Sequence, residues 1–550
     1  MRLARLTLLL LLVPSLPGFA LPAAAQRSAL SPDIAQALAS IDDAHLRAHL
    51  SFLSDDMLEG RAPGTRGGEL AAHYIATRFE RIGLAPVGGG YLRDVRLAGW
   101  RPVRDSIRAA LVTFGRRTPL TYPDDVVLWT ETRDGAASVD AELVFVGFGI
   151  RAPEYDWDDY GPIDVRGKAV LVLVGEPDAP PGEPGLFGGP EMTRYARWNY
   201  KVEEAGRRGA AAVLLIHTPV AAGYGWTVVQ SSWTSERFSL RDDTAAARSP
   251  LLGWIRAEVV RPFLTATGRD PGNLESIAAQ PGFQARSLNV SLLARAFGRV
   301  RTVHAPNVLG VLPGSHPERR AEVVVFTAHY DHLGIGPAVN GDSIYNGAYD
   351  NASGVAALLE VAEALAQLRT PPERSILFLA TTAEEAGLLG ATEYVRTPAF
   401  PIRQTVAAIN LDGVNMWGET HDVIALGGSR SSLGDLVRSR ARLLDMYVAP
   451  EPSPETGLLF RTDLAVFARR GVPAIGLMHG SAFRNQPPGW GDLFLARWEA
   501  LHYHRPSDEY DPATDLAGAL QQIRLAFLVG FDAAHGSRPV LHRPLSASIR

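Results

Sequence analysis

From residue 301 onward, short and continuously apolar segments alternate with longer amphipathic segments. The apolar segments have the length and composition of strands buried on both faces, namely AEVVVFTA, SILFLATT, TVAAINL and GVPAIGLMH. The segments between them have the apolar spacing of helices, and the last one is DLAGALQQIRLAFLVGFDAA. This alternation predicts an α/β fold with a mostly parallel central sheet and helices on both of its faces. In such sheets the ligand site lies at the carboxyl ends of the strands.

The part of the chain before residue 301 contains two regions with different sequence patterns. Residues 31–84 show helical apolar spacing, and Gly83 is a helix stop. Residues 126–300 contain short Val-rich strands between loops rich in proline and glycine. A chain of 550 residues is too long for one ordinary core. We therefore predict a split α/β domain of residues 26–125 and 301–550, interrupted by a β-rich domain at residues 126–300.

The first 25 residues have the features of a secretory signal peptide. A basic start is followed by a leucine-rich run and by small residues that end at Ala25. Pro14 and Pro17 interrupt the apolar run before it reaches the roughly 20 residues that a membrane span needs. We therefore expect cleavage after Ala25, export to the periplasm or the extracellular space, and no membrane anchor.

Composition excludes several classes of protein. The chain has no cysteine, which rules out disulfide scaffolds, thiol nucleophiles and cysteine-ligated metals. Its net charge of −5 gives no electrostatic footprint for nucleic acid, so we expect no nucleic-acid partner. Lys168 and Lys201 are the only lysines, which leaves little scope for a lysine base or a Schiff base.

Acids and histidines follow several of the apolar strands directly. A residue of this kind is by itself more often a helix cap or a packed histidine, but several at the strand ends of one sheet indicate a metal site. Oxygen and imidazole ligands without sulfur suit zinc, manganese or cobalt. The candidates are His329, Asp331, His332, Asp350, Glu384, Glu385, Asp412, His502 and His504.

The residue types favour a site with two divalent ions. Such a site needs a carboxylate that bridges the ions and an open position for a hydroxide, and Asp350, on a glycine-flanked turn, is the natural bridge. It also needs a free carboxylate as general base. If a helix begins at Glu384 and Glu385, their side chains point about 100° apart, so one faces the metals and the other is free for the base role.

Five sequence blocks, in this order, closely resemble those of the co-catalytic zinc exopeptidases, a family that includes secreted bacterial zinc aminopeptidases and glutamate carboxypeptidase. The blocks are AHYDHLG, YNGAYDNASG, TTAEEAGLLG, INLDGV and YHRPSDEYD. The resemblance also covers the N-terminal segment MLEGRAPGTRGGELAAHYIATRFERIGL, and the inserted block resembles a protease-associated domain. It implies two divalent ions, with zinc the first choice, and a peptide substrate.

The resemblance also implies a role for each site residue. Asp350 would bridge the two ions. His329 and Asp412 would complete one metal site, and Glu385 and His504 would complete the other.

Two further residues receive roles from the same blocks. Glu384 would be the general base, and Asp331 would orient the imidazole of His329. His504 is preferred to His502 because it follows a tyrosine and precedes RPSDEYD, as the last ligand of the family does.

The chain departs from the family pattern at one visible place. Where many relatives have Ser-Asp-His, it has Thr462, Asp463 and Leu464. None of the predicted ligands is affected, and we expect a change in the wall on the substrate side.

The predicted function is that of a secreted metal-dependent exopeptidase, with an aminopeptidase as the first choice. Such an enzyme would hydrolyse N-terminal residues from peptides with a bridging hydroxide and a glutamate base. A carboxypeptidase or dipeptidase of the same fold would need arginines that face the site. Arg403, Arg461 and Arg484 are available, but in an arginine-rich chain they are more typical of solvated surface.

Three other functions can be compared with these. A non-catalytic, receptor-like ectodomain would have lost its ligands, and here the set is complete. A glutaminyl cyclase typically works with a single zinc, which the bridging set argues against. The sequence has neither the Gly-x-Ser-x-Gly elbow of serine hydrolases nor the His-Glu-x-x-His of single-zinc proteases. The oligomeric state stays open.

Overall fold

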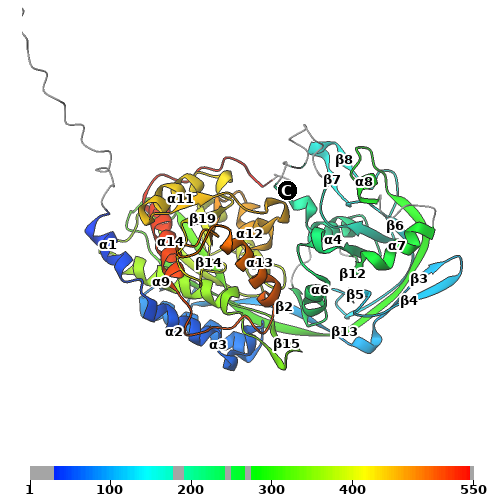
Figure 1. Ribbon diagram of the computed structural model, residues 1–550, viewed down its shortest axis with the longest axis horizontal. Helices are drawn as coiled ribbons and strands as arrows, with labels where there is room; N and C mark the ends of the chain where they lie inside the picture. Colours follow the sequence, from blue (N-terminus) through cyan, green and yellow to red (C-terminus); the bar gives the residue numbers. More distant parts are fainter. Residues whose placement is uncertain (1–29, 178–186, 188–190, 242–248, 267–273, 546–550) are drawn as a thin grey trace, which may run out of the picture.

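The computed structural model describes residues 30–177, 187, 191–241, 249–266 and 274–545. It has an α/β lobe and a β-rich lobe, which lie side by side in Figure 1. The predicted signal peptide lies outside the described residues. Among the helices that are described, none has both the length and the apolar character needed to cross a membrane.

The α/β lobe is built on a sheet with the strand order β13–β17–β14–β18–β21–β19–β20. The strands are β13 (Arg286–Leu312), β14 (Val323–His329), β17 (Ser375–Thr381), β18 (Thr405–Asn410), β19 (Asp422–Leu426), β20 (Tyr447–Ala449) and β21 (Ala474–His479). Strands β17, β14, β18 and β21 are parallel, whereas β13 and β19 pair antiparallel with β17 and β21. The predicted α/β fold is confirmed, and its parallel strands are flanked by antiparallel ones.

Helices cover both faces of this sheet, because alternate strand residues point to opposite sides. Val324 and Phe326 of β14 pack in one apolar cluster with helices α2, α3, α9, α11 and α14. Val323 and Val325 pack in another cluster with α10 and α12. The bounds of these helices are α2 Asp43–Leu53, α3 Arg66–Ile82, α9 Gly354–Ala366, α10 Leu389–Arg396, α11 Leu433–Ala441, α12 Leu464–Ala468 and α14 Ala517–His535.

Helix α3 illustrates how the local sequence sets these elements. The Thr65 hydroxyl accepts a hydrogen bond from the N–H of Gly68 at 3.2 Å, which caps the start of the helix. Gly83 ends it in the left-handed conformation, at φ 86°, where a residue with a Cβ is disfavoured. The helix stop predicted at Gly83 is confirmed.

The β-rich lobe has its own sheet and its own apolar core. Its strand order is β4–β3–β13–β6–β9–β10–β12–β5. Beside β13 the strands are β3 (Arg108–Thr113), β4 (Arg116–Leu120), β5 (Val126–Trp129), β6 (Ala136–Phe145), β9 (Ala169–Leu173), β10 (Ala212–His217) and β12 (Leu251–Arg256). Because β3 and β4 precede residue 126 and still pair in this sheet, the hydrogen-bonded unit begins before that residue. The division into domains at residues 126 and 300 stays a prediction.

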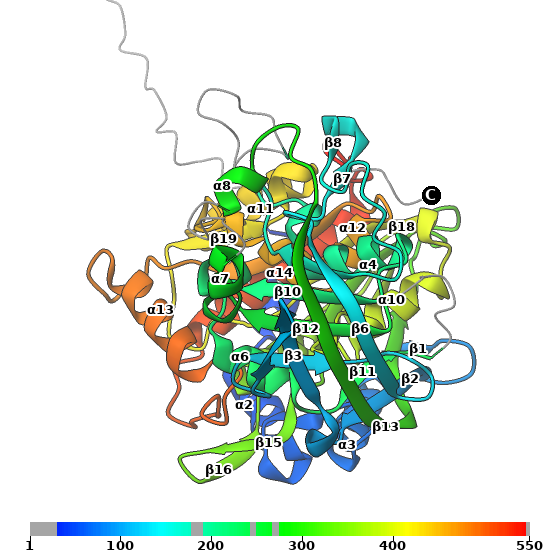
Figure 2. The ribbon, with the colours of Figure 1, turned by 90° about the vertical axis from the view of Figure 1, so that its right-hand side faces the viewer.

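Strand β13 belongs to both sheets, and Figure 2 shows it running beside β6. Between the two sheets it pairs with β2 (Leu92–Pro102), which in turn pairs with β11 (Arg237–Leu240). A continuous hydrogen-bonded ribbon therefore joins the lobes.

The remaining helices and strands are α1 (Pro32–Ala39), α4 (Trp198–Arg207), α5 (Pro219–Ala222), α6 (Trp226–Trp233), α7 (Ala257–Ala266), α8 (Leu274–Ala278), α13 (Trp490–His502), β1 (Ala85–Pro86), β7 (Arg151–Ala152), β8 (Trp157–Asp158), β15 (Gly334–Val339) and β16 (Asp342–Tyr345).

Candidate metal centre

The predicted ligands come from five separate places in the chain and meet at the carboxyl edge of the parallel strands. His329 is the last residue of β14, and Asp412 follows β18. Glu385 lies in the turn after β17. Asp350 lies in the helical turn that precedes α9, and His504 follows α13. The topology thus places them where ligand sites of α/β sheets are found.

Asp350 lies between two imidazole–carboxylate pairs. Its Oδ1 is 3.3 Å from His329 Nε2, which is 3.2 Å from Asp412 Oδ1. Its Oδ2 is 3.2 Å from His504 Nε2, which is 3.2 Å from Glu385 Oε2. The two oxygens of one carboxylate therefore face two different half-sites, as in a bridging ligand.

The spacing of these atoms fits bound zinc. Nitrogen and oxygen ligands that lie about 2.0–2.1 Å from one tetrahedral zinc ion are about 3.3 Å from each other. The four nitrogen–oxygen separations match this value. The buried guanidinium behind them, Arg61, donates to backbone carbonyls, including that of Tyr330 at 2.8 Å and that of Gly347 at 2.9 Å. The donor set thus combines buried carboxylates with imidazole nitrogens, and this combination suits divalent cations.

The two adjacent glutamates have opposite pKa shifts. Burial raises the pKa of the Glu385 carboxyl, but the neighbouring His504 and His332 outweigh burial and lower it to about 2. Burial, opposed by His329, raises the pKa of Glu384 well above its usual range. A metal ligand needs the charged carboxylate, whereas a general base needs an elevated pKa. The opposite pKa shifts therefore suit Glu385 as a ligand and Glu384 as the base.

The expectation that a helix starts at the glutamates is wrong. Helix α10 begins only at Leu389, and both glutamates lie in a turn after Ala383, which has a φ of 53°. The Asp331 carboxylate accepts the N–H of Glu384 at 3.1 Å and that of Glu385 at 3.4 Å. These two bonds replace the first turn of the expected helix.

Asp331 contacts His329 mainly through its backbone. His329 Nδ1 lies 3.1 Å from the Asp331 carbonyl oxygen and 3.9 Å from its carboxylate. The carboxylate therefore holds the turn of the glutamates, while the carbonyl fixes the imidazole. Its role in orienting His329 stays a prediction.

Two residues near the ligands had no role in the sequence analysis. His332 Nδ1 lies 2.7 Å from Glu385 Oε1, and Asp508 accepts the N–H groups of Tyr349 at 2.9 Å and of Asp350 at 3.0 Å. Both residues stand inside the quoted blocks AHYDHLG and YHRPSDEYD, and His332 was also among the candidates that follow an apolar strand. His502, which was not preferred as a ligand, instead has its Nδ1 3.0 Å from the Ser507 carbonyl oxygen.

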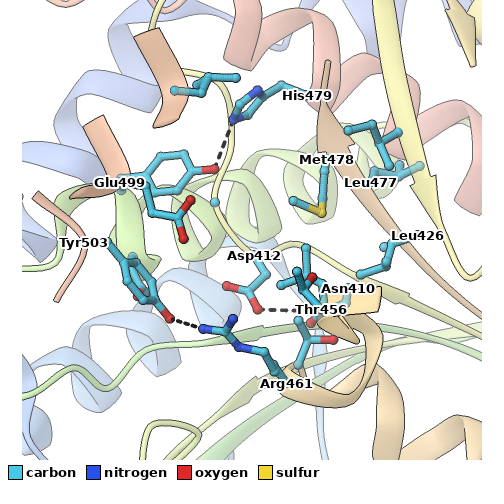
Figure 3. Close-up of a pocket in the computed structure, with 18 of the residues that line it drawn as sticks. Asn410, Asp412, Leu426, Thr456, Arg461, Leu477, Met478, His479, Glu499 and Tyr503 are labelled. Atoms are coloured by element: carbon cyan, nitrogen blue, oxygen red, sulfur yellow. Dashed lines mark hydrogen bonds between the residues drawn. The ribbon is translucent and has the colours of Figure 1, made fainter. Parts of the chain in front are cut away.

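A cavity of about 390 Å³ opens onto the metal centre, and its walls come from both lobes. Apolar side chains such as Trp417, Leu477 and Met478 line it together with the charged Glu499 and Arg461. Figure 3 shows the Arg461 guanidinium donating to the Tyr503 hydroxyl, at a distance of 3.3 Å. The β-rich lobe contributes Gly223.

One expectation about this wall needs correction and another stays a prediction. Thr462 lines the cavity, while Leu464 is fully buried in the apolar cluster that contains Phe467 and Leu377, so the change expected in the substrate-side wall stays a prediction. Arg461 is not solvated surface, because it lines the cavity, whereas Arg403 is exposed and Arg484 donates to the Leu444 carbonyl at 3.1 Å. The sequence analysis therefore misplaced Arg461, because composition does not tell which way a side chain points.

The fold and the paired half-sites fit the expectation of a co-catalytic zinc exopeptidase. Residues 307–528 match Peptidase family M28, so this part of the chain is a peptidase M28 domain. The resemblance stated from the five sequence blocks, which all lie within residues 307–528, is confirmed, and the protease-associated assignment of the inserted block stays a prediction.

Known proteins agree with this assignment over part of their length. LpqL of Mycobacterium tuberculosis, a probable lipoprotein aminopeptidase, is 27% identical over 274 residues, which are 47% of this chain and 51% of that protein. An aminopeptidase of Pseudomonas aeruginosa is 33% identical over 164 residues, which are 29% of this chain and 28% of that protein. The chain therefore spans about half of the first relative and less than a third of the second.

A solved structure agrees over most of the chain. The aminopeptidase from Aneurinibacillus sp. strain AM-1 matches with a TM-score of 0.55 and 20% identity, covering 92% of this chain and 98% of that one. At this identity the likeness concerns the fold alone.

Proposed function

We propose that this chain is a zinc-dependent exopeptidase. The first candidate is an aminopeptidase, which removes N-terminal residues from peptides. The observation that carries the proposal is the position of Asp350 between the His329–Asp412 pair and the His504–Glu385 pair. A carboxylate shared by two half-sites is what two cooperating ions require. The aminopeptidases among the relatives support the same activity.

The protein's own groups would then act as follows. When bound, two zinc ions supply Lewis acidity toward the scissile carbonyl and the attacking water. Glu384 takes the proton of that water and delivers it to the leaving amine. Asp331 positions Glu384 through the backbone N–H, so the proton acceptor is held on a fixed turn. The apolar wall around Met478 binds the side chain of the substrate.

Glu384→Gln tests this role, because the amide keeps the shape of the side chain and cannot accept the proton. We expect kcat on amino-acid p-nitroanilides to fall by roughly 10²- to 10⁴-fold, with an unchanged zinc content. Exhaustive chelation should also abolish turnover, and added zinc should restore it. Hydrolysis that survives either treatment would sink the proposal, and protein that never takes up zinc would favour the non-catalytic ectodomain.

A carboxypeptidase or dipeptidase is the second candidate, and Arg461 is the observation that favours it. This half-buried guanidinium faces the cavity, and among the described residues it forms no ion pair with a carboxylate. It could bind a free C-terminal carboxylate of the substrate. Peptides blocked at one end separate the candidates: N-acetylation abolishes cleavage by an aminopeptidase, and C-amidation abolishes cleavage by a carboxypeptidase.

The β-rich lobe, for which we also propose the protease-associated assignment, would restrict substrates to short peptides. Gly223 lines the cavity, and the lobes also meet where the Met192 N–H donates to the Pro454 carbonyl at 3.0 Å. We expect kcat/KM to fall as peptides lengthen from two to about ten residues, since this wall limits their exit path. A flat dependence on length would remove the idea.

The proposed location is the periplasm or the extracellular space, reached after removal of residues 1–25. N-terminal sequencing of protein recovered from a producing cell tests it. Gln26 as the first residue is expected, and protein retained in the cytoplasm with Met1 intact would contradict export.

A further inference from the structure

A second group of potential metal ligands lies on helices α2 and α9, which pack against each other (Figure 1). His45 and His49 are four residues apart on α2, and Glu360 and Glu363 are three residues apart on α9. These spacings place each pair on one helix face. The two faces meet, so two imidazoles stand opposite two carboxylates. Glu360 lies about 9 Å along α9 from its first residue, outside the catalytic cavity.

The distances resemble those of the catalytic centre. One donor atom each of His45, Glu360 and Glu363 lies within 4.8 Å of the others. His49 Nε2 is 3.5 Å from Glu360 Oε1, near the 3.3 Å expected for two ligands of one tetrahedral zinc ion. The group of three does not include His49, which contacts it through Glu360.

Burial supplies the second and independent observation. His49 and Glu360 are 1% and 2% exposed, and neither His49 Nε2 nor Glu360 Oε1 has a hydrogen-bond partner among the described residues. His49 Nδ1 lies 2.8 Å from the Tyr74 hydroxyl, which fixes the ring with Nε2 toward Glu360. A buried donor set without partners is costly unless something fills it.

Charges around the group compete for it. Arg81 contacts both oxygens of Glu363 at 2.8 Å, and the charge of Arg78 acts on His49. Burial first, and then Arg78, lowers the pKa of His49 to about 3, so this imidazole is neutral and has a free nitrogen lone pair. With Tyr74 as acceptor for Nδ1–H, the lone pair of Nε2 faces a carboxylate oxygen, an arrangement that a cation stabilises.

We propose that His45, His49, Glu360 and Glu363 form a third, non-catalytic zinc site that ties helix α2 to helix α9. Two imidazoles and two carboxylates favour zinc over calcium and magnesium, which prefer oxygen ligands alone. Helix α2 also packs on the turn at residues 348–353, which carries Asp350. The ion would therefore fasten the N-terminal helices to the element that precedes the catalytic centre.

Metal content tests the site without any activity assay. After dialysis against buffered zinc, we expect about three zinc ions per wild-type chain and about two in His45→Ala, whose side chain is half exposed. Asp350→Asn removes the catalytic bridge and should leave the α2–α9 ion bound. Two ions per chain in both wild type and His45→Ala would overturn the proposal and leave a plain His49–Glu360 contact.

Thermal unfolding in the Asp350→Asn background gives a second readout. Zinc should raise Tm in this variant and should not raise it once His45→Ala is added. Arg81→Gln, the matched control, frees Glu363 from its competitor and should tighten zinc binding several-fold. Equal zinc responses with and without His45, or weaker binding in Arg81→Gln, would contradict the site. The total of three ions includes the two of the proposed catalytic centre, whereas the difference of one ion between wild type and His45→Ala does not rest on the peptidase activity.

Discussion

The two lobes both bury charged side chains, but they compensate for them differently. At the edge of the α/β sheet, Asp350, Asp412 and Glu385 contact histidines alone among the described ion pairs. In the β-rich lobe, Asp159 accepts the Ile150 N–H at 2.8 Å and the Trp157 indole N–H at 2.7 Å, and the charge of the buried Lys201 acts on it. The first cluster is left for cations to complete, and the second is completed by the protein itself.

This difference separates a functional site from a structural one. Lys201 donates to the Gly175 carbonyl at 2.8 Å and is fully buried, so the protein itself supplies a partner for its ammonium group. The metal centre instead borders a cavity. Breaking the first cluster should therefore cost activity, and breaking the second should cost stability.

The largest expected effect comes from Asp350→Asn. An amide cannot bridge two ions as a carboxylate does, so both catalytic half-sites should weaken together. The loss of several kcal/mol of metal assistance corresponds to a fall in kcat/KM of about a thousandfold or more. Kinetics on a p-nitroanilide and zinc analysis check it. A variant that keeps near wild-type turnover would show that the bridge is not needed.

Lys201→Met tests the other side of the comparison. It removes the positive charge that acts on the buried Asp159 and the donor to the Gly175 carbonyl, and we expect a clear loss in the free energy of unfolding. Denaturant titration measures this loss. The matched control is Lys168→Met, which removes the partly exposed Lys168–Glu142 pair at 2.9 Å and should cost at most about 1 kcal/mol.

Two further results would decide how Lys201 acts. Adding Asp159→Asn to Lys201→Met should recover part of the lost stability, because the uncompensated charge is gone. If Lys201→Met and Lys168→Met lose the same free energy of unfolding, the buried lysine contributes no more to stability than the exposed one.

Asp331→Asn sharpens the description of the metal centre. The amide can accept one of the two N–H bonds from the glutamate turn but not both, so Glu384 and Glu385 should lose their fixed positions. Groups that hold metal ligands in place typically contribute about 10- to 100-fold. We expect a fall in kcat with a smaller change in KM. A change confined to KM would contradict a positioning role.

The smallest effect belongs to an exposed pair in the β-rich lobe. Arg166 donates to the Asp164 carboxylate and lowers its pKa to about 2. Because the folded pKa lies below the unfolded one, the contribution is complete above about pH 4 and is lost as pH falls toward 2. The Tm difference between wild type and Asp164→Asn should be small at pH 7 and shrink below pH 4. A difference that grows in acid would contradict this sign.

Much of the metal centre was predictable because ligand position follows strand position. His329 and Asp412 follow apolar strands, and the carboxyl ends of parallel strands meet at one edge. The glycine-flanked turn indicated Asp350 as the bridge, and the ordered blocks then supplied the role of His504, which no periodicity gives.

The misses share a physical cause, since each depends on contacts between distant segments. The turn at Glu384 depends on Asp331, which follows β14 and accepts the N–H groups of both glutamates, whereas helical spacing alone placed the start of α10 too early. The pairing of β3 with β13 joins residues about 180 positions apart. Arg461 points into the cavity because of tertiary packing, which composition does not encode.

The alternation of side chains along strand β13 limits which insertions this architecture tolerates. Leu292 and Ala294, at even positions, pack in the core of the β-rich lobe, while Val303 and Ala305, at odd positions, pack in the cluster beside β2. Inserting a single residue near Arg301 would turn every later side chain to the opposite face. Exchanging the β-rich lobe between homologues therefore requires junctions that preserve this odd–even phase, or a bulge that absorbs the slip.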